Sequence, residues 1–149
     1  MHDLAGPPLL HLTWETDPDC CKLIAARFPQ AKPRGDVLKE TASSVVEIID
    51  KHDPHQTCAV IMAAAPPCPD FSQMNASAEG FDGAEGSKFT SYVQLADSIE
   101  AGLGPRQVRH LCENVVFQHK AECNYISSAL RAEPVVLDAA DFGSIGRPR

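Results

Sequence analysis

The residues best suited to chemistry gather around one cysteine. Cys68 lies in the run Ala65-Pro66-Pro67-Cys68-Pro69-Asp70-Phe71-Ser72, directly after an apolar run that starts at Cys58. The prolines on both sides restrict the backbone around the thiol. A rigid thiol at the end of a strand suits a nucleophile, because attack requires close positioning on the target atom. The residues alone leave a second interpretation open, a turn that contains a cysteine.

Acidic and amide side chains follow other apolar runs. Glu113 and Asn114 come at the end of one run and could bind the amidine-like edge of a base. Glu15 ends another run, the position from which a carboxylate commonly accepts hydrogen bonds from ribose hydroxyls in nucleotide-binding sheets. Asp36, in Gly35-Asp36-Val37, is a weaker candidate for an adenine contact. Taken singly, a solvated strand end, a helix cap or a turn explains each of these segments better than a functional role does.

Two arginines stand close to the end of the sequence. Arg147 and Arg149 are separated by one residue and could contact a base or a phosphate. An isolated basic pair at a chain end is the alternative.

The elements that must position these residues alternate between strand-like and helical patterns. Strands are expected at 9–15, 58–65, 110–117 and 134–138, and helices at 17–28, 41–52, 87–103 and 118–131. The continuous apolar run 58–65 predicts a strand buried on both faces, and 66–86 predicts a long loop. This alternation favours an α/β fold with mostly parallel strands, in which ligands bind at the carboxyl ends of the strands.

Composition narrows the classes of function. With 149 residues, 44% hydrophobic and 22% charged, the chain is expected to form one globular domain, and the absence of a signal or membrane-span pattern makes an intracellular protein the default. The net charge of −7 argues against a stand-alone DNA-binding protein. The six cysteines show neither C-x-x-C pairs nor zinc-ligand spacing, so we expect reduced thiols and no metal.

The order of these motifs resembles the cytosine-C5 DNA methyltransferase family. Glu-x-Asp, Gly-Asp-Val, Pro-Pro-Cys with Phe-Ser, Glu-Asn-Val and Asp-Phe-Gly with Arg-x-Arg follow one another in the usual order, from about Leu9 to Arg149. The resemblance implies a mostly parallel, Rossmann-like sheet that uses S-adenosylmethionine and acts on a flipped-out cytosine in DNA.

The resemblance also implies roles for single residues. Cys68 would add to C6 of the cytosine, Glu113 would protonate or hydrogen-bond N3, and Arg147 and Arg149 would contact the base carbonyl and help hold the catalytic loop. The cofactor would be held by Glu15, Asp36 and Pro66. The substrate pocket would be shaped by Pro67, Phe71, Ser72, Asn114 and Val115.

The family pattern is incomplete in this sequence. It lacks the Phe-x-Gly-x-Gly turn before the second strand and the target recognition region, and Gly146 stands where a glutamine usually precedes the paired arginines. We therefore expect residues 1–149 to be a partial catalytic domain, active with a second polypeptide or as part of a longer product. Two alternatives stay open: a catalytically silent module that pairs with a full-length enzyme, and a tRNA methyltransferase fragment.

Overall fold

The computed structural model describes residues 6–72, 74–117 and 119–137. Its elements alternate along the chain as β1 (Leu12–Trp14), α2 (Pro18–Arg27), β2 (Lys32–Gly35), η1 (Val37–Lys39), α3 (Ala42–His52), β3 (Val60–Ala64), η2 (Pro69–Phe71), η3 (Gly80–Asp82), α4 (Gly86–Leu103), β4 (Val108–Cys112) and α5 (Lys120–Leu130). The predicted mixed α/β character is confirmed. Between β3 and α4 the described residues form two short 3₁₀ turns and an isolated bridge at Ser72, as expected for a loop.

Local sequence explains where the helices begin. Asp17 caps α2 by accepting hydrogen bonds from the backbone N–H groups of Asp19 and Cys20, and Pro18 takes the first helical position. Thr41 caps α3 in the same way through the N–H of Ser44. These caps satisfy backbone donors that have no partner inside the helix.

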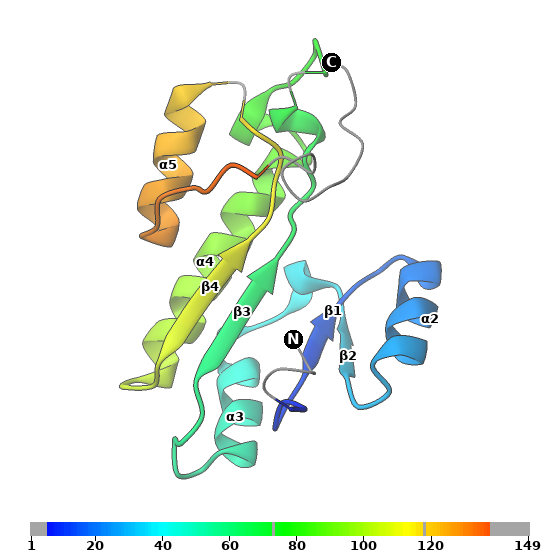
Figure 1. The fold of residues 1–149 in the computed structure, drawn as a ribbon, viewed down its shortest axis with the longest axis vertical. Helices are drawn as coiled ribbons and strands as arrows, with labels where there is room; N and C mark the ends of the chain where they lie inside the picture. Colours follow the sequence, from blue (N-terminus) through cyan, green and yellow to red (C-terminus); the bar gives the residue numbers. More distant parts are fainter. Residues whose placement is uncertain (1–5, 73, 118, 138–149) are drawn as a thin grey trace.

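The strands form two parallel pairs. β1 pairs with β2 across α2, and β3 pairs with β4 across α4, in register from Val60 opposite Val108 to Ala64 opposite Cys112. Both pairs are therefore strand–helix–strand units, and the expected parallel arrangement is confirmed. Among the described residues, β1 and β3 each have one unpaired edge, and β1 lies between β2 and β3 in Figure 1.

The core has two apolar clusters on the long helix α4. Val45 of α3 packs with Ile99 and Leu103 of α4, and the inner faces of β1 and β3 lie against this first cluster. The second cluster joins Phe71 of the loop to Phe89 and Val93 of α4. One helix therefore supports both strand pairs and the loop that carries Cys68.

Three details differ from the sequence-based expectations. β3 is not buried on both faces: burial alternates along it, and Ile61 is 59% exposed on the outer face. β2 was missed because Lys32-Pro33-Arg34-Gly35 has no apolar run, and hydrogen bonds to β1 define it instead. Residues 134–137 are not a strand, and Val135 is 78% exposed there. Asp138, the last residue of that expected strand, lies outside the described residues.

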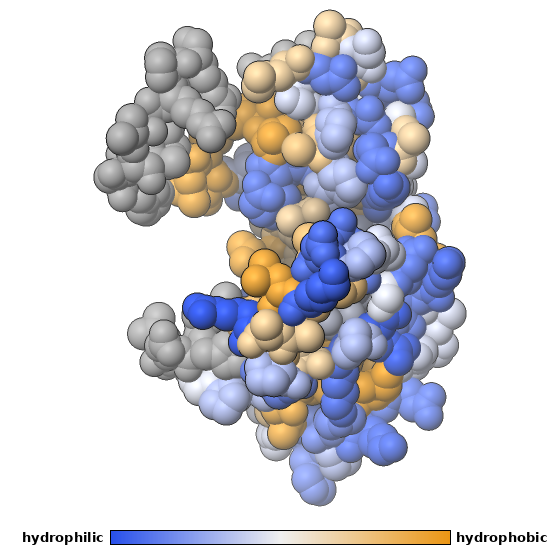
Figure 2. All heavy atoms as spheres, turned by 90° about the vertical axis from the view of Figure 1, so that its right-hand side faces the viewer, coloured by the Kyte–Doolittle hydropathy of each residue, from blue (hydrophilic) through white to orange (hydrophobic). Residues whose placement is uncertain are grey.

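Exposed apolar side chains lie close in sequence to the β1–β2 pair, among them Leu9, Leu23 and Leu38. Figure 2 shows the face that carries β1, β2 and α2, with apolar side chains gathered beside a hollow between the upper and lower parts. No residue of β1 or β2 is buried. Parallel sheets are normally covered on both faces. The strands β1 and β2 are more exposed than that, as strands at the margin of a sheet are.

Candidate functional site

Cys68 stands four residues beyond the end of β3, at the start of a tight turn. It precedes η2, and its carbonyl accepts a hydrogen bond from the N–H of Phe71 at 3.0 Å. Its side chain is half-buried. The thiol is therefore held on an ordered turn and is not sealed in the core.

Glu113 and Asn114 follow β4 next to that turn. The N–H of Glu113 donates to the carbonyl of Ala64 at 2.9 Å, and Asn114 Nδ2 donates to the carbonyl of Pro66 at 3.4 Å. Asn114 Oδ1 also accepts from the N–H of Val115 at 2.8 Å. The structure therefore brings the Pro-Pro-Cys and Glu-Asn-Val segments together, with the Glu113 side chain exposed beside them.

Phe71 and Ser72 fix the far side of the turn. Phe71 has 0% exposure, and its ring lies edge-on against Phe117 with centroids 5.2 Å apart. Phe71 has no free surface and serves as a core anchor, so any part it takes in the substrate pocket is to hold the turn and not to contact the substrate. Ser72 forms an isolated antiparallel bridge with Phe117 and stays partly exposed.

Asp70 is a residue whose contacts the sequence did not predict. Its Oδ2 accepts hydrogen bonds from the backbone N–H groups of Glu85 at 2.8 Å and Gly86 at 2.9 Å, where α4 begins. Sequence patterns detect caps within a few residues of a helix start. This cap comes from fifteen residues away and carries no such signal.

Cys112 and Tyr92 are half-buried titratable groups in the apolar cluster beneath the site. Burial, reinforced by the carboxylate of Glu113, raises the pKa of the Cys112 thiol to about 11. Burial, with a smaller contribution from Cys112, raises the pKa of Tyr92 to about 12. A thiol held in its protonated form is a poor nucleophile. Cys68 is therefore the better nucleophile candidate of the two cysteines at this edge.

Glu15 and Asp36 come together at the other strand pair. Trp14 lies opposite Gly35 in the register, so the two acidic residues leave β1 and β2 side by side. Glu15 Oε1 accepts from the N–H groups of Thr16 and Asp17, and Asp36 Oδ1 accepts from the N–H of Leu38. The second oxygen of each carboxylate, Oε2 of Glu15 and Oδ2 of Asp36, accepts none of these backbone hydrogen bonds.

A cavity of about 260 Å³ opens next to Asp36, between η1 and α4. Its walls are formed by Val37, Leu38, Glu40, Ser91, Tyr92 and Leu95. The hydroxyl of Tyr92 is buried without a hydrogen-bond partner in the described structure. Ligand pockets usually measure about 300–1,000 Å³, so this cavity suits one flat ring or a similar part of a larger ligand.

A second feature missed from the sequence is a polar cluster that supports this cavity. Glu40 accepts hydrogen bonds from Trp14 Nε1 at 2.9 Å and from Arg34 Nε at 2.8 Å, and its side chain is 6% exposed. The Arg34 guanidinium, followed by the indole and a backbone N–H, lowers the pKa of Glu40 to about 2. The cluster ties β1 and β2 to the start of α3. No short-range pattern links these three positions.

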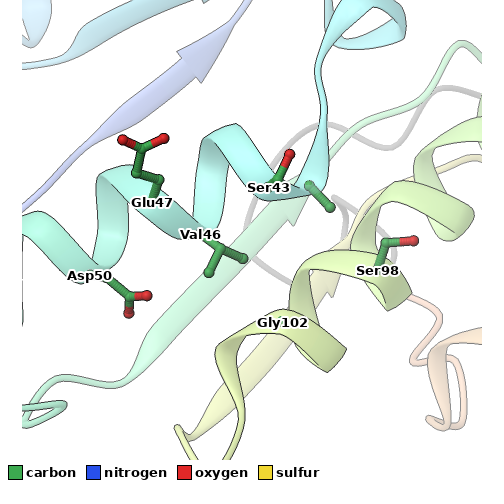
Figure 3. Close-up of a pocket in the computed structure, with 7 residues that line it drawn as sticks. Ser43, Val46, Glu47, Asp50, Ser98 and Gly102 are labelled. Carbon is green, nitrogen blue, oxygen red and sulfur yellow. The ribbon is translucent and has the colours of Figure 1, made fainter.

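A second groove lies elsewhere, between α3 and α4. It has a volume of about 570 Å³ and is lined by Ala42, Ser43, Val46, Glu47, Asp50, Ser98 and Gly102. Figure 3 shows Ser43, Val46, Glu47 and Asp50 on one helix, facing Ser98 and Gly102 on the other. Asp50 is already paired with Arg106 at 2.5 Å. The groove contains none of the strand-end residues, so it is not the candidate site.

Arg147 and Arg149 lie outside the described residues. Within the described residues the six cysteines are free, and no three His, Cys, Asp or Glu side chains are grouped to hold a metal ion. No helix in the same ranges has the length and apolar character needed to cross a bilayer.

Comparison of the chain with protein-family models and with curated proteins gives no match. The functional argument therefore rests on the motifs and on the geometry described above.

Proposed function

We propose that this chain carries the catalytic centre of a cytosine-C5 DNA methyltransferase. The observation that supports the proposal most strongly is the junction of the two strand ends, where backbone and side-chain hydrogen bonds hold the Cys68 turn beside Glu113 and Asn114. A nucleophile and a carboxylic acid at one edge of a parallel sheet are the two groups that addition to a pyrimidine requires.

In the proposed reaction, the Cys68 thiolate forms a bond to C6 of an extruded cytosine. The electron pair of the C5–C6 double bond moves to C5, while Glu113 donates a proton or hydrogen bond to N3 and so stabilises the charge that develops. C5 would then accept a methyl group from a sulfonium donor, whose S–CH3 electron pair would stay on the sulfur as the donor leaves as a neutral thioether, and a base removes the C5 proton. The electron pair of the C5–H bond then re-forms the double bond and expels the Cys68 thiolate. Val115 lies in the segment that carries Glu113, and Ser72 lies in the segment that carries Cys68. Both are expected to shape the substrate pocket.

The methyl donor implied by this reaction is S-adenosylmethionine, which supplies an electrophilic methyl group. The residues at β1 and β2 fit its nucleoside part: Glu15 Oε2 can accept bonds from ribose hydroxyls, and Asp36 directly precedes Val37, which lines a cavity suited to a flat ring. Pro66 is expected to contact the same cofactor. The proposed binding surface therefore spans both strand pairs, as in other nucleotide-binding sheets.

The proposal includes DNA and a second polypeptide as partners. A formal charge of −7 gives little attraction for phosphates, so the basic surface would come from the partner. The unpaired edges of β1 and β3 support this view, because backbone groups on an open edge are available to pair with another strand. A longer product containing the same sequence would supply these parts equally well.

The test is covalent trapping of Cys68 by DNA that contains pyrimidin-2-one at the target position. This base accepts a thiolate at C6 without needing a methyl donor, so the step is isolated from cofactor binding. The proposal predicts an adduct that survives denaturing gel electrophoresis, disappears in Cys68→Ser and persists in Cys58→Ser, since Cys58 is an exposed cysteine on the same chain. Equal adduct formation by both variants would overturn it.

Two alternatives are separated by the same experiment. The free strand edges also suit a catalytically silent module that pairs with a full-length enzyme. That module would form no adduct with or without its partner. A tRNA methyltransferase fragment would form the adduct with RNA that contains the analogue and not with DNA.

A further inference from the structure

Asp70 connects the turn that carries Cys68 to the longest helix of the molecule. It lies two residues after the cysteine, within η2, and its Oδ2 accepts the N–H groups of Glu85 and Gly86. Those groups open α4, which has 18 residues. The first N–H groups of a helix have no partner inside it, so a side chain from the turn fills this role.

Nothing closer in the sequence replaces Asp70 as the cap of α4. Glu85 occupies the N-cap position and makes no side-chain capping bond; its carboxylate is paired with Lys88 instead. The Asp70 carboxylate therefore meets both the helix N–H groups and the positive end of the helix dipole. Through this contact, the position of the turn depends on that of α4.

Gly83 shows that the fold leaves space for this carboxylate. A Cβ atom at Gly83 would stand 2.2 Å from Asp70 Oδ2 and 2.4 Å from its Cγ. The φ of Gly83 is −73°, which any residue can adopt. The requirement for glycine at this position is therefore set by the Asp70 side chain and not by the backbone.

We propose that Asp70 is a positioning residue for Cys68, which holds the thiol in the geometry needed for attack by locking its turn to the start of α4. Asp70 is not expected to touch the substrate. The inference rests on the proposed function for its catalytic consequence, whereas the mechanical link between Asp70 and Cys68 is independent of it.

Two readouts with opposite signs test the link. In Asp70→Ala, alkylation of Cys68 by iodoacetamide, followed by peptide mass spectrometry well below the unfolding temperature, should become faster by about fivefold, the factor that corresponds to about 1 kcal/mol of lost capping. Trapping of pyrimidin-2-one DNA should become slower by a similar factor. Faster alkylation together with slower trapping would show that the Cys68 thiol is more accessible but no longer positioned for attack.

Matched variants separate positioning from general loss of stability. Asp70→Asn keeps one oxygen acceptor and should restore much of both rates. Asp17→Ala removes a similar cap from α2, remote from the turn, and should leave Cys68 unchanged. If Asp70→Ala left the alkylation rate of Cys68 unaltered, or if Asp17→Ala changed it equally, the inference would be wrong.

Gly83→Ala alone provides a second route if Asp70→Ala folds poorly, because it should speed alkylation of Cys68 by displacing the carboxylate from the start of α4. Where both variants fold, adding Asp70→Ala to Gly83→Ala should cause little further change, because the capping contact has already been lost. Independent, additive effects would contradict the link. Absence of any DNA adduct in the wild type would count against the proposed function alone, because alkylation still decides the role of Asp70.

Discussion

The two strand pairs of this protein are held by different forces. The β3–β4 pair and its loop rest on aromatic packing, in which Phe71 and Phe89 are both fully buried. The β1–β2 pair contains no buried residue: Leu12 and Trp14 of β1 pack against the first cluster from one side, and a polar cluster centred on Glu40 ties the pair to the start of α3. Apolar packing is insensitive to pH and fixes positions closely, whereas charged hydrogen bonds vary with pH. The half that carries the nucleophile is therefore the more rigidly built.

The largest effect is expected from Phe71→Ala, which removes the anchor of the β3–β4 half. The free energy of unfolding should fall by about 4 kcal/mol, the usual cost of deleting a buried aromatic ring. Urea denaturation followed by circular dichroism measures it. Met74→Ala is the matched control in the same loop, because Met74 is 92% exposed and its loss should be nearly neutral. Equal losses for the two variants would mean that the loop is not anchored by its aromatic ring.

The next effect concerns the thiol on the inner face of β4. Because burial raises the pKa of Cys112 to about 11, its alkylation at pH 8 should be roughly a hundredfold slower than that of an ordinary cysteine thiol. Peptide mass spectrometry after timed treatment with iodoacetamide measures the rate, with the exposed Cys58 as internal reference. Rapid labelling of Cys112 would show that the β3–β4 half is looser than its packing indicates.

A smaller effect is expected from Glu40→Gln in the β1–β2 half. Loss of the charged hydrogen bonds to Arg34 and Trp14 should cost about 2 kcal/mol of unfolding free energy. Chemical denaturation at pH 7 gives the value.

The same variant tests how this half responds to pH. The pKa of Glu40 is about 2 in the folded chain, below its ordinary 4.5, so its stabilisation is complete above about pH 4.5 and is lost as the pH falls toward 2. The difference between wild type and Glu40→Gln should therefore shrink over that range. A difference that stayed constant would show that the carboxylate is not the source of the stability.

The smallest effect is expected from Asp17→Ala, which removes the cap of α2. About 1 kcal/mol is the usual cost of losing such a cap, and α2 has no buried residue to add to it. Amide hydrogen exchange should become faster in α2 and stay unchanged in α4. Faster exchange in both helices would mean that the two halves unfold as one unit, which would weaken the contrast drawn above.

The sequence by itself determined the alternation of strands and helices, the loop after β3 and the placement of Cys68, Glu113 and Glu15 at or just past strand ends. These follow from local signals: apolar runs, helical spacing and capping residues close to each helix start. Proline and acidic residues indicate where the apolar runs, and therefore the expected strands, end.

Only the tertiary structure decided the rest. The capping of α4 by Asp70, the buried state of Phe71 and the contact of Glu40 with Trp14 all join positions that lie far apart in the chain. The strand β2, with no apolar pattern of its own, exists through hydrogen bonds to β1. Sequence patterns report interactions within one element, whereas these features depend on which elements the fold brings into contact.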